Sequence, residues 1–327
     1  MTKYIFYPGC SLMGTASPYY DSIKAIQDKI SVEIEEVNDW NCCGATEYQA
    51  VERVAGHAII GRNLAIAQTQ IDGADTLTAP CSACYLNLSK TDHYMATDPD
   101  LNAKVNDALS VGGLSYNPGS VKIRHFLDVV FNDVGIEKIK SLVTKPLKGL
   151  RLAAYYGCMI TRPDLDHRFS SHEYPTVLEE LLEALGAEVI DFPLKTHCCS
   201  GHMTQISGDT ALELIRRLLD GAAKYEADML VTLCPMCQMN VDAFQNEVNK
   251  KFKTDYEIPI AYFTQVMGLA FGLTPKELGF GREFIDAKPA IAKIGIEVPE
   301  EGKKPKRKKE EGLPMPMMPG HPGGGAE

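Results

Sequence analysis

Short apolar segments alternate with segments of helical periodicity along the first 285 residues. Residues 3–7 and 151–156 are aromatic and apolar runs of the length typical of buried strands. Two later segments carry apolar side chains mostly three or four positions apart. These positions are Val51, Val54, Ala55, Ala58, Ile59, Leu64 and Ala67 in the first segment, and Ala211, Leu214, Ile215, Leu218 and Leu219 in the second. Alternating strands and amphipathic helices predict an α/β fold with mainly parallel sheets.

The two halves of this region resemble each other. Residues 3–10 (KYIFYPGC) align with 151–158 (RLAAYYGC), and residues 75–81 (DTLTAPC) align with 228–234 (DMLVTLC). A third pair is 125–135 (HFLDVVFNDVG) with 262–272 (YFTQVMGLAFG). This internal repeat predicts a duplicated body. We expect one domain over 1–148, a second over 149–285, and a C-terminal extension over 286–327.

Composition narrows the class of protein. The chain has 327 residues, of which 45% are apolar, enough for two cores. Its net charge of −10 disfavours binding to nucleic acid or to an anionic membrane. No apolar run approaches the roughly 18 residues of a membrane span, and the N-terminus has no signal-peptide core, so we expect a cytoplasmic protein. The extension is rich in Lys, Pro, Gly and Met, which predicts a flexible or docking segment.

All ten cysteines belong to two copies of one pattern. Each copy has a single cysteine, an adjacent pair and a CxxC motif, and each single cysteine and CxxC follows a predicted strand. The first set is Cys10, Cys42, Cys43, Cys81 and Cys84; the second is Cys158, Cys198, Cys199, Cys234 and Cys237. Because ligands gather at the carboxyl ends of parallel strands, the topology is expected to bring each set together.

Three simpler interpretations compete with an iron–sulfur site. Structural zinc commonly uses two CxxC pairs, whereas each set has one CxxC and a fifth sulfur. Disulfides are disfavoured in a reducing compartment, and burial of cysteine as a small apolar residue does not explain a repeated constellation. Thiolates are the standard ligands of iron–sulfur clusters, so iron–sulfur binding in at least one set is favoured. Zinc in one set, or in both, remains open.

The duplicated pattern Cys, Cys-Cys-Gly, CxxC resembles the CCG-domain family, and over residues 1–285 it is similar to the B subunit of heterodisulfide reductase. The resemblance implies two pseudo-symmetric, Rossmann-like CCG domains, each holding a noncubane 4Fe-4S cluster on its five cysteines. It also implies reduction of a disulfide to two thiols between the clusters, with the mixed disulfide of coenzyme M and coenzyme B as substrate in a methanogen. One departure is visible, because the second copy has Ser200 between Cys199 and Gly201.

The same resemblance implies two partners in a heterodisulfide reductase complex. One is the C subunit, a ferredoxin-like iron–sulfur protein, and the other is the flavin-containing A subunit. The chain has no GxGxxG fingerprint of its own, so electrons are expected to arrive through protein contacts. Two alternatives stay open. One is a heterodisulfide reductase-like subunit of a sulfur-oxidising complex, and the other is an electron-transfer subunit with one iron–sulfur site and one structural zinc site.

A few polar residues near the second set are weaker candidates. His197 and His202 flank the second cysteine pair and could protonate a departing thiolate, although each is as well explained as an ordinary surface histidine. Four basic residues after Cys158 are candidates for binding an anionic cofactor, although a solvated loop is the favoured explanation. They are Arg162, His167, Arg168 and His172.

Overall fold

The computed structural model describes residues 1–45, 48–72, 74–163, 165 and 171–296, and within them it has two parallel four-stranded sheets. The first sheet has the order β2-β1-β3-β4 and the second has the order β6-β5-β7-β8. The strands are β1 (Thr2–Phe6), β2 (Val32–Glu36), β3 (Thr76–Ala79), β4 (Lys122–His125), β5 (Arg151–Tyr155), β6 (Glu188–Ile190), β7 (Met229–Thr232) and β8 (Ile260–Tyr262). The identical strand order confirms the predicted α/β class and the predicted duplication.

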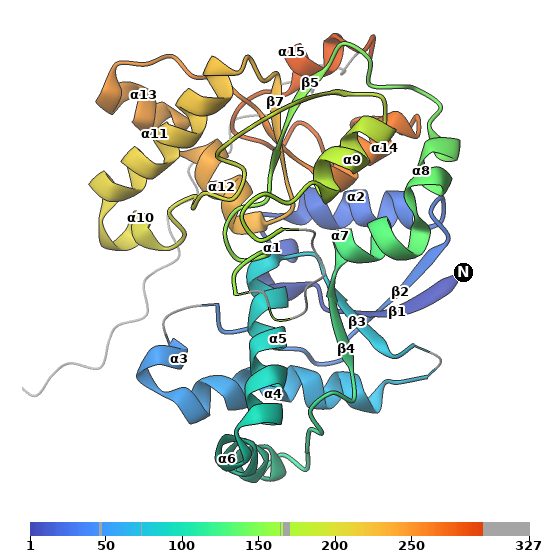
Figure 1. Cartoon of the computed structure of the whole chain (residues 1–327), viewed down its shortest axis with the longest axis vertical. Coiled ribbons are helices and arrows are strands. Elements are labelled where there is room, and N and C mark those ends of the chain that lie inside the picture. Colours follow the sequence, from blue (N-terminus) through green and yellow to red (C-terminus); the bar gives the residue numbers. More distant parts are fainter. Residues whose placement is uncertain (46–47, 73, 164, 166–170, 297–327) are drawn as a thin grey trace, which may run out of the picture.

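Helices connect successive strands in both halves (Figure 1). The first half has α1 (Gly9–Leu12), α2 (Ser17–Gln27), α3 (Tyr48–Val51), α4 (Arg53–Thr69), α5 (Ser82–Thr97), α6 (Pro99–Ser110), α7 (Phe126–Asp128), the π-helical η1 (Val129–Val134) and α8 (Ile136–Leu142). The second half has α9 (Val177–Ala184), α10 (Met203–Ile206), α11 (Gly208–Lys224), α12 (Pro235–Ala243), α13 (Gln245–Phe252), α14 (Phe263–Ala270) and α15 (Lys288–Ala292).

The burial of the central strands β3 and β7 accounts for their continuous runs of non-charged residues. All four residues of β3 and all four of β7 are buried, as expected for a parallel strand that has neighbours on both sides and helices on both faces. The helical periodicity also corresponds to observed helices, with one difference. The pattern over residues 48–70 is broken at Glu52, whose extended φ of −131° and ψ of 85° separate α3 from α4. Val51, part of that apolar pattern, is 74% exposed rather than buried.

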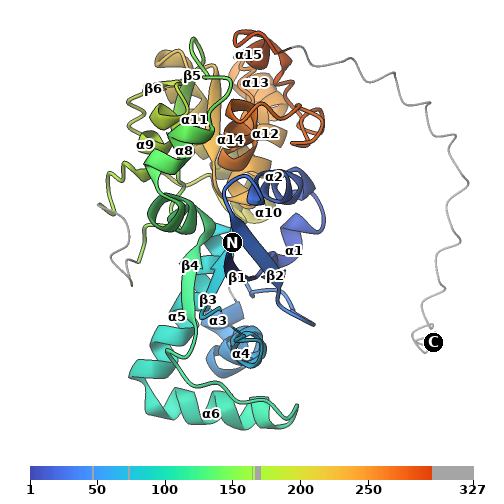
Figure 2. The same ribbon diagram turned by 90° about the vertical axis from the view of Figure 1, so that its right-hand side faces the viewer.

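One contact between the two halves is made by a helix from each half, α2 and α14. In Figures 1 and 2, α2 of the first half lies against α14 of the second. The hydroxyl oxygens of Ser22 and Thr264 are 2.6 Å apart at this contact, and the rings of Tyr19 and Tyr262 are stacked with centroids 4.1 Å apart. Arg282 reaches back to form an ion pair with Asp21 in α2. These contacts fix the orientation of one sheet relative to the other.

The expected C-terminal extension is described as far as residue 296. In this part, α15 buries Ile291 completely, and Lys293 pairs with Asp228 at 2.5 Å. Residues 297–327 lie outside the described residues, and the domain limits at 148 and 285 stay predictions. None of the helices in the described ranges combines the length and the apolar character that crossing a bilayer requires.

Candidate metal centre

The ten cysteines lie where the carboxyl ends of the strands meet. Cys10 follows β1 and Cys158 follows β5. Cys81 and Cys234 follow β3 and β7 and are the N-cap residues of α5 and α12. In each half, the adjacent pair lies in the loop that follows the edge strand, after β2 or after β6. The repeated topology therefore places equivalent cysteines at equivalent positions of the two halves.

The five thiols of the first set form a row. The Sγ atoms of Cys10 and Cys42 are 4.0 Å apart, and those of Cys43 and Cys84 are 3.1 Å apart. The pKa of Cys42 responds to the neighbouring Cys43 thiol, and that of Cys84 responds to both Cys43 and Cys81, so these thiols complete the row. Cys10 and Cys42 are exposed, whereas the other three are buried. One end of the row thus reaches the protein surface, and the other end lies in the core.

The second set repeats this arrangement. The thiols of Cys158 and Cys198 lie close enough to shift each other's pKa, and the pKa of Cys199 responds to both Cys198 and Cys237. Cys237 in turn contacts Cys234. The exposed member of this set is Cys198, while Cys199, Cys234 and Cys237 are buried. The prediction that each fivefold set is brought together in space therefore agrees with the geometry.

The rows meet end to end at the boundary between the halves. The thiols of Cys81 and Cys234 lie close enough to shift each other's pKa, upward for Cys81 and downward for Cys234, so the two rows adjoin at this pair. In the described part of the chain, no three or more Cys, His, Asp and Glu side chains form a group ready to hold a metal ion. The sulfurs instead meet in pairs along the row. A row of five thiols fits a cluster with several irons, which has separate ligand positions, better than it fits four-coordinate zinc.

Electrostatics favours thiolates within both rows. Hydrogen bonds from the thiols of Cys42 and Cys84 lower the pKa of Cys43. Hydrogen bonds from the Cys158 and Cys199 thiols lower the pKa of Cys198 to about 3. Likewise, Cys237 and Cys81 lower the pKa of Cys234, which also caps the positive N-terminal end of α12. Because the thiolate is the form of cysteine that binds metals, each row contains at least one sulfur whose pKa favours the metal-binding form.

Two equivalent glycines leave room for the sulfurs. Gly9 and Gly157 have left-handed φ angles of +71° and +69°. A Cβ atom on Gly9 would lie 2.8 Å from the Sγ atom of Cys84, and one on Gly157 would lie 2.6 Å from the Sγ atom of Cys237. Any side chain at these positions would therefore displace a cysteine of the CxxC motif. The space and the donor set fit a thiolate-bound iron–sulfur group.

In each half, one tyrosine and one asparagine hold the loop that carries the cysteine pair. The cysteine pattern alone did not predict these four residues. The Tyr7 and Tyr155 hydroxyls donate to the carbonyls of Asn41 and His197, at 2.6 and 2.9 Å. Asn87 and Asn240 donate from Nδ2 to the carbonyls of Cys43 and Cys199, at 3.0 and 3.1 Å. Each tyrosine lies three residues before a single cysteine, and each asparagine lies three residues after a CxxC motif. The alignment of the two halves contains this signal.

The Ser200 insertion changes the loop that follows the second cysteine pair. Ser200 adopts a left-handed φ of +81°, and Gly201 follows with +55°. Asn240 accommodates the longer loop because its Nδ2 atom also donates to the Gly201 carbonyl at 2.8 Å and lies 3.3 Å from the Ser200 hydroxyl. Its partner in the first half, Asn87, has the equivalent bond to Cys43.

The weaker candidates are dispersed. The His197 side chain is exposed, and its carbonyl supports Tyr155. His202 caps α10 and lines an open groove between the halves. A catalytic role for either histidine stays a prediction. Arg162 pairs with Glu173 at 3.0 Å, whereas His167 and Arg168 lie outside the described residues.

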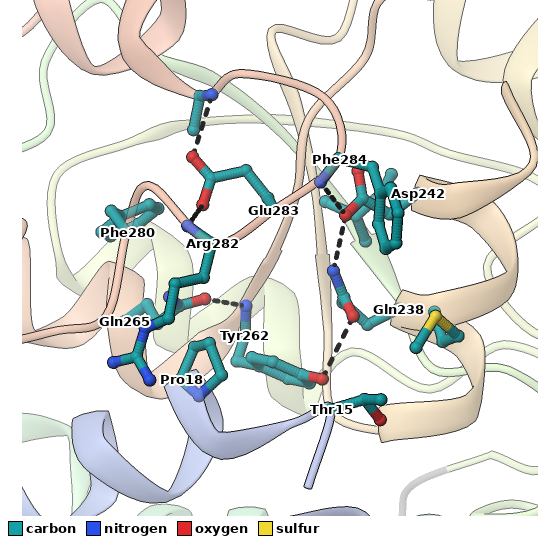
Figure 3. A pocket seen from close by; sticks show the side chains of 13 residues that line it. Thr15, Pro18, Gln238, Asp242, Tyr262, Gln265, Phe280, Arg282, Glu283 and Phe284 are labelled. Atoms are coloured by element: carbon teal, nitrogen blue, oxygen red, sulfur yellow. Dashed lines mark hydrogen bonds between the residues drawn. The ribbon is translucent and has the colours of Figure 1, made fainter. Parts of the chain in front are cut away.

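Figure 3 shows a polar network that includes Tyr262, whose pKa is raised by burial and by the nearby thiols of Cys234 and Cys81. The Tyr262 hydroxyl donates to Gln238 at 3.3 Å, and the Gln238 amide donates to Asp242 at 2.9 Å. Asp242 also accepts the backbone amides of Phe284 and Ile285. Burial raises the pKa of Asp242 to about 6, while these amides act in the opposite direction. The network borders a cavity of about 30 Å³, which is large enough for a water molecule.

Comparisons with known proteins agree with this geometry. The cysteine-rich domain model named CCG matches residues 4–89 and 152–242, once in each half. The chain is 35% identical over 285 residues to the 8-methylmenaquinol:fumarate reductase membrane anchor subunit of Wolinella succinogenes, covering 87% of this chain and 98% of that protein. It is 31% identical over 297 residues to the B subunit of the ferredoxin/F420H2-dependent CoB-CoM heterodisulfide reductase of Methanosarcina acetivorans. This match covers 90% of this chain and 97% of that protein.

A solved structure shares the fold. The crystal structure of a hypothetical protein from Helicobacter pylori superposes with a TM-score of 0.68 at 13% sequence identity. The match covers 87% of this chain but only 52% of that one. The family model accounts for both five-cysteine sets, and the relatives extend over nearly the whole described body. The chain belongs to the CCG family of cysteine-rich domain proteins, together with the heterodisulfide reductase B subunits that it resembles.

Proposed function

We propose that this protein is the disulfide-reducing component of a multi-subunit oxidoreductase related to heterodisulfide reductase. The observation that carries the proposal is the meeting of the two cysteine rows at Cys81 and Cys234. Reduction of a disulfide consumes two electrons and two protons, breaks the S–S bond and yields two thiols. A pair of equivalent redox sites that meet at one place suits this stoichiometry, because an iron–sulfur cluster, when bound, supplies electrons one at a time.

Each set of five cysteines would hold one 4Fe-4S cluster of the noncubane type. The first cluster would use Cys10, Cys42, Cys43, Cys81 and Cys84, and the second would use Cys158, Cys198, Cys199, Cys234 and Cys237. The protein positions these ligands with its strand ends and helix N-termini, and it excludes water from the buried members of each row. Asn87 and Asn240 hold the backbone of the paired cysteines in place.

Electrons would enter from other proteins of the complex. The proposed partners are a ferredoxin-like iron–sulfur protein, equivalent to the C subunit of heterodisulfide reductase, and a flavin-containing protein, equivalent to its A subunit. The coenzyme M–coenzyme B heterodisulfide is the substrate if the host is a methanogen. In a sulfur-oxidising host, a heterodisulfide reductase-like complex would use another sulfur compound.

A second candidate function rests on the relative from Wolinella succinogenes, at 35% identity. That protein is named as the membrane anchor of an 8-methylmenaquinol:fumarate reductase. By this relationship, our chain would carry electrons between a quinol and a partner enzyme and would reduce no disulfide. The two-row arrangement would then serve as an electron path only.

Metal content tests the two-cluster assignment, and substrate specificity separates the two candidate functions. The complex should be purified without oxygen and analysed for iron and zinc. About eight irons per chain is the expected value for two clusters, whereas about four irons with one zinc would favour an electron-transfer protein with a structural zinc site. Reduced viologen should then drive disulfide reduction. Oxidation of a menaquinol analogue, with no reduction of any disulfide, would select the second candidate.

A further inference from the structure

An open groove of about 380 Å³ lies between the two cysteine-pair loops. Ala45 comes two residues after the first pair, and His202 comes three residues after the second; both line the groove. Side chains of α4 and α5 form the wall contributed by the first half, and Met159, next to Cys158, contributes to the other wall. A concave site of this size between two domains is a typical place for a small ligand.

The groove is basic in a protein with a net charge of −10. Arg53 and Lys90 line it, and none of its described lining residues is acidic. Burial lowers the pKa of His57, and the nearby charges of Arg53 and Lys90 lower it further, so both cations lie close to this neutral ring. Arg53 uses one Nη2 bond for Asp98, at 2.9 Å, which leaves further guanidinium donors for a ligand.

The duplication does not account for these cations. Lys90 lies six residues after Cys84, and the residue six after Cys237 is Ala243. The helices α4 and α11 have 17 residues each, and the positions of Arg53 and His57 correspond to Gly208 and Leu212 when the helices are aligned from their first residues. The cysteines, tyrosines and asparagines of the site are repeated, whereas the two cations of the groove, Arg53 and Lys90, are not.

The groove also adjoins the first cysteine set and has apolar walls. Asn87 lines it while donating to the carbonyl of Cys43, so a ligand in the groove lies next to this loop. Leu86 and Tyr94, one turn before and one turn after Lys90 on α5, add apolar surface to the groove. A ligand matched to this surface has an anionic end, a short apolar segment and a reactive end near the cysteines.

We propose that the groove selects an anionic disulfide and orients it, with a carboxylate, sulfonate or phosphate group against Arg53 and Lys90. This inference rests on the proposed disulfide reduction and adds the charge of the substrate and its direction. The anionic half of an asymmetric disulfide lies on the side of the first cysteine set. The positions of the second half that correspond to these cations, Gly208 and Ala243, carry no charge.

Three symmetric disulfides of similar length test the charge preference: dithiodipropionate, which is a dianion, bis(hydroxyethyl) disulfide, which is neutral, and cystamine, which is a dication. The intact complex, purified without oxygen, should show a kcat/KM at least about tenfold higher for the dianion than for the neutral compound, with the dication slowest. The R53Q/K90Q double variant should lose this preference, mainly through KM, and should retain its rate with the neutral disulfide. Higher ionic strength should reduce the preference in the wild type.

The control is K122Q, which removes a cation that pairs with Asp75 at the opposite end of the first sheet. Equal kcat/KM for all three disulfides, or an unchanged preference in R53Q/K90Q, would overturn the anionic groove while leaving disulfide reduction standing. If no disulfide is reduced, the proposed function fails. Calorimetric titration of dithiodipropionate into the oxidised complex then tests whether the groove binds an anionic disulfide. Binding that weakens at least about tenfold in R53Q/K90Q supports the groove, and binding that is absent or unaffected overturns it.

Discussion

Cys81 and Cys234 come from different halves of the chain, yet their thiols lie close enough to raise the pKa of Cys81 and lower that of Cys234. Each is the N-cap of a helix, so the positive ends of α5 and α12 converge on the pair. This contact joins two five-cysteine rows that would otherwise be independent sites. A redox group bound by either row would lie next to the inner end of the other.

Substitution of one buried cysteine should remove one cluster only. In Cys43→Ala the row is broken between Cys42 and Cys84, and in Cys199→Ala it is broken between Cys198 and Cys237. We expect iron to fall from about eight to about four per chain in each variant, with loss of disulfide reduction in both. Anaerobic metal analysis checks the first expectation, and a viologen-coupled assay checks the second. Retained turnover in both variants would exclude a mechanism that needs both sets.

Gly157→Ala should displace a ligand as well as strain the backbone. The new Cβ atom would lie 2.6 Å from the Sγ atom of Cys237 at a φ of +69°. Gly149→Ala is the matched control, because Gly149 also has a left-handed φ, of +89°, but has no heavy atom near the new Cβ position. The control should lose about 1–2 kcal/mol of unfolding free energy and keep its iron. Gly157→Ala should lose iron from the second set, and equal iron in the two variants would contradict the predicted clash.

Asn240→Ala should destabilise the protein more than Asn87→Ala does. Asn240 is buried and donates to two carbonyls, those of Cys199 and Gly201, whereas Asn87 is partly exposed and donates to the carbonyl of Cys43. Loss of the buried donor should cost about 1–3 kcal/mol of unfolding free energy. Denaturant unfolding without oxygen measures the difference. An equal loss in the two variants would show that the longer Ser200 loop does not depend on Asn240.

Asp242 should make stability depend on pH. Its pKa in the folded protein is about 6, above the ordinary value, because the carboxyl is buried. The folded state therefore holds a proton that the unfolded state releases, and stability decreases as pH rises from about 4 to about 6. Relative to Asp242→Asn, the wild type should lose about 2–3 kcal/mol over this interval. Unfolding measured across this pH range gives the difference, and parallel curves for the two proteins would contradict it.

Hydrophobic periodicity and cysteine spacing predicted the strands, most of the helices and the grouping of the cysteines. The buried runs before Cys10 and Cys158 and the periodicity over 211–219 correspond to β1, β5 and α11. The failure at Glu52 has a local cause, since an exposed Val51 contributed to an apparently continuous helical pattern. Spacing also predicted that each five-cysteine set would gather, because parallel strands bring their carboxyl ends to one edge.

The amino-acid order alone was sufficient for the duplication, the α/β class and the identity of the ten cysteines, because these depend on spacing and on local hydrophobic periodicity. The contact between Cys81 and Cys234 was decided by packing between distant helices, in particular α2 against α14. The basic groove likewise arises from residues on α4 and α5 that meet Met159 and His202 only when the halves dock. Such contacts join residues far apart in the chain, so no local pattern encodes them.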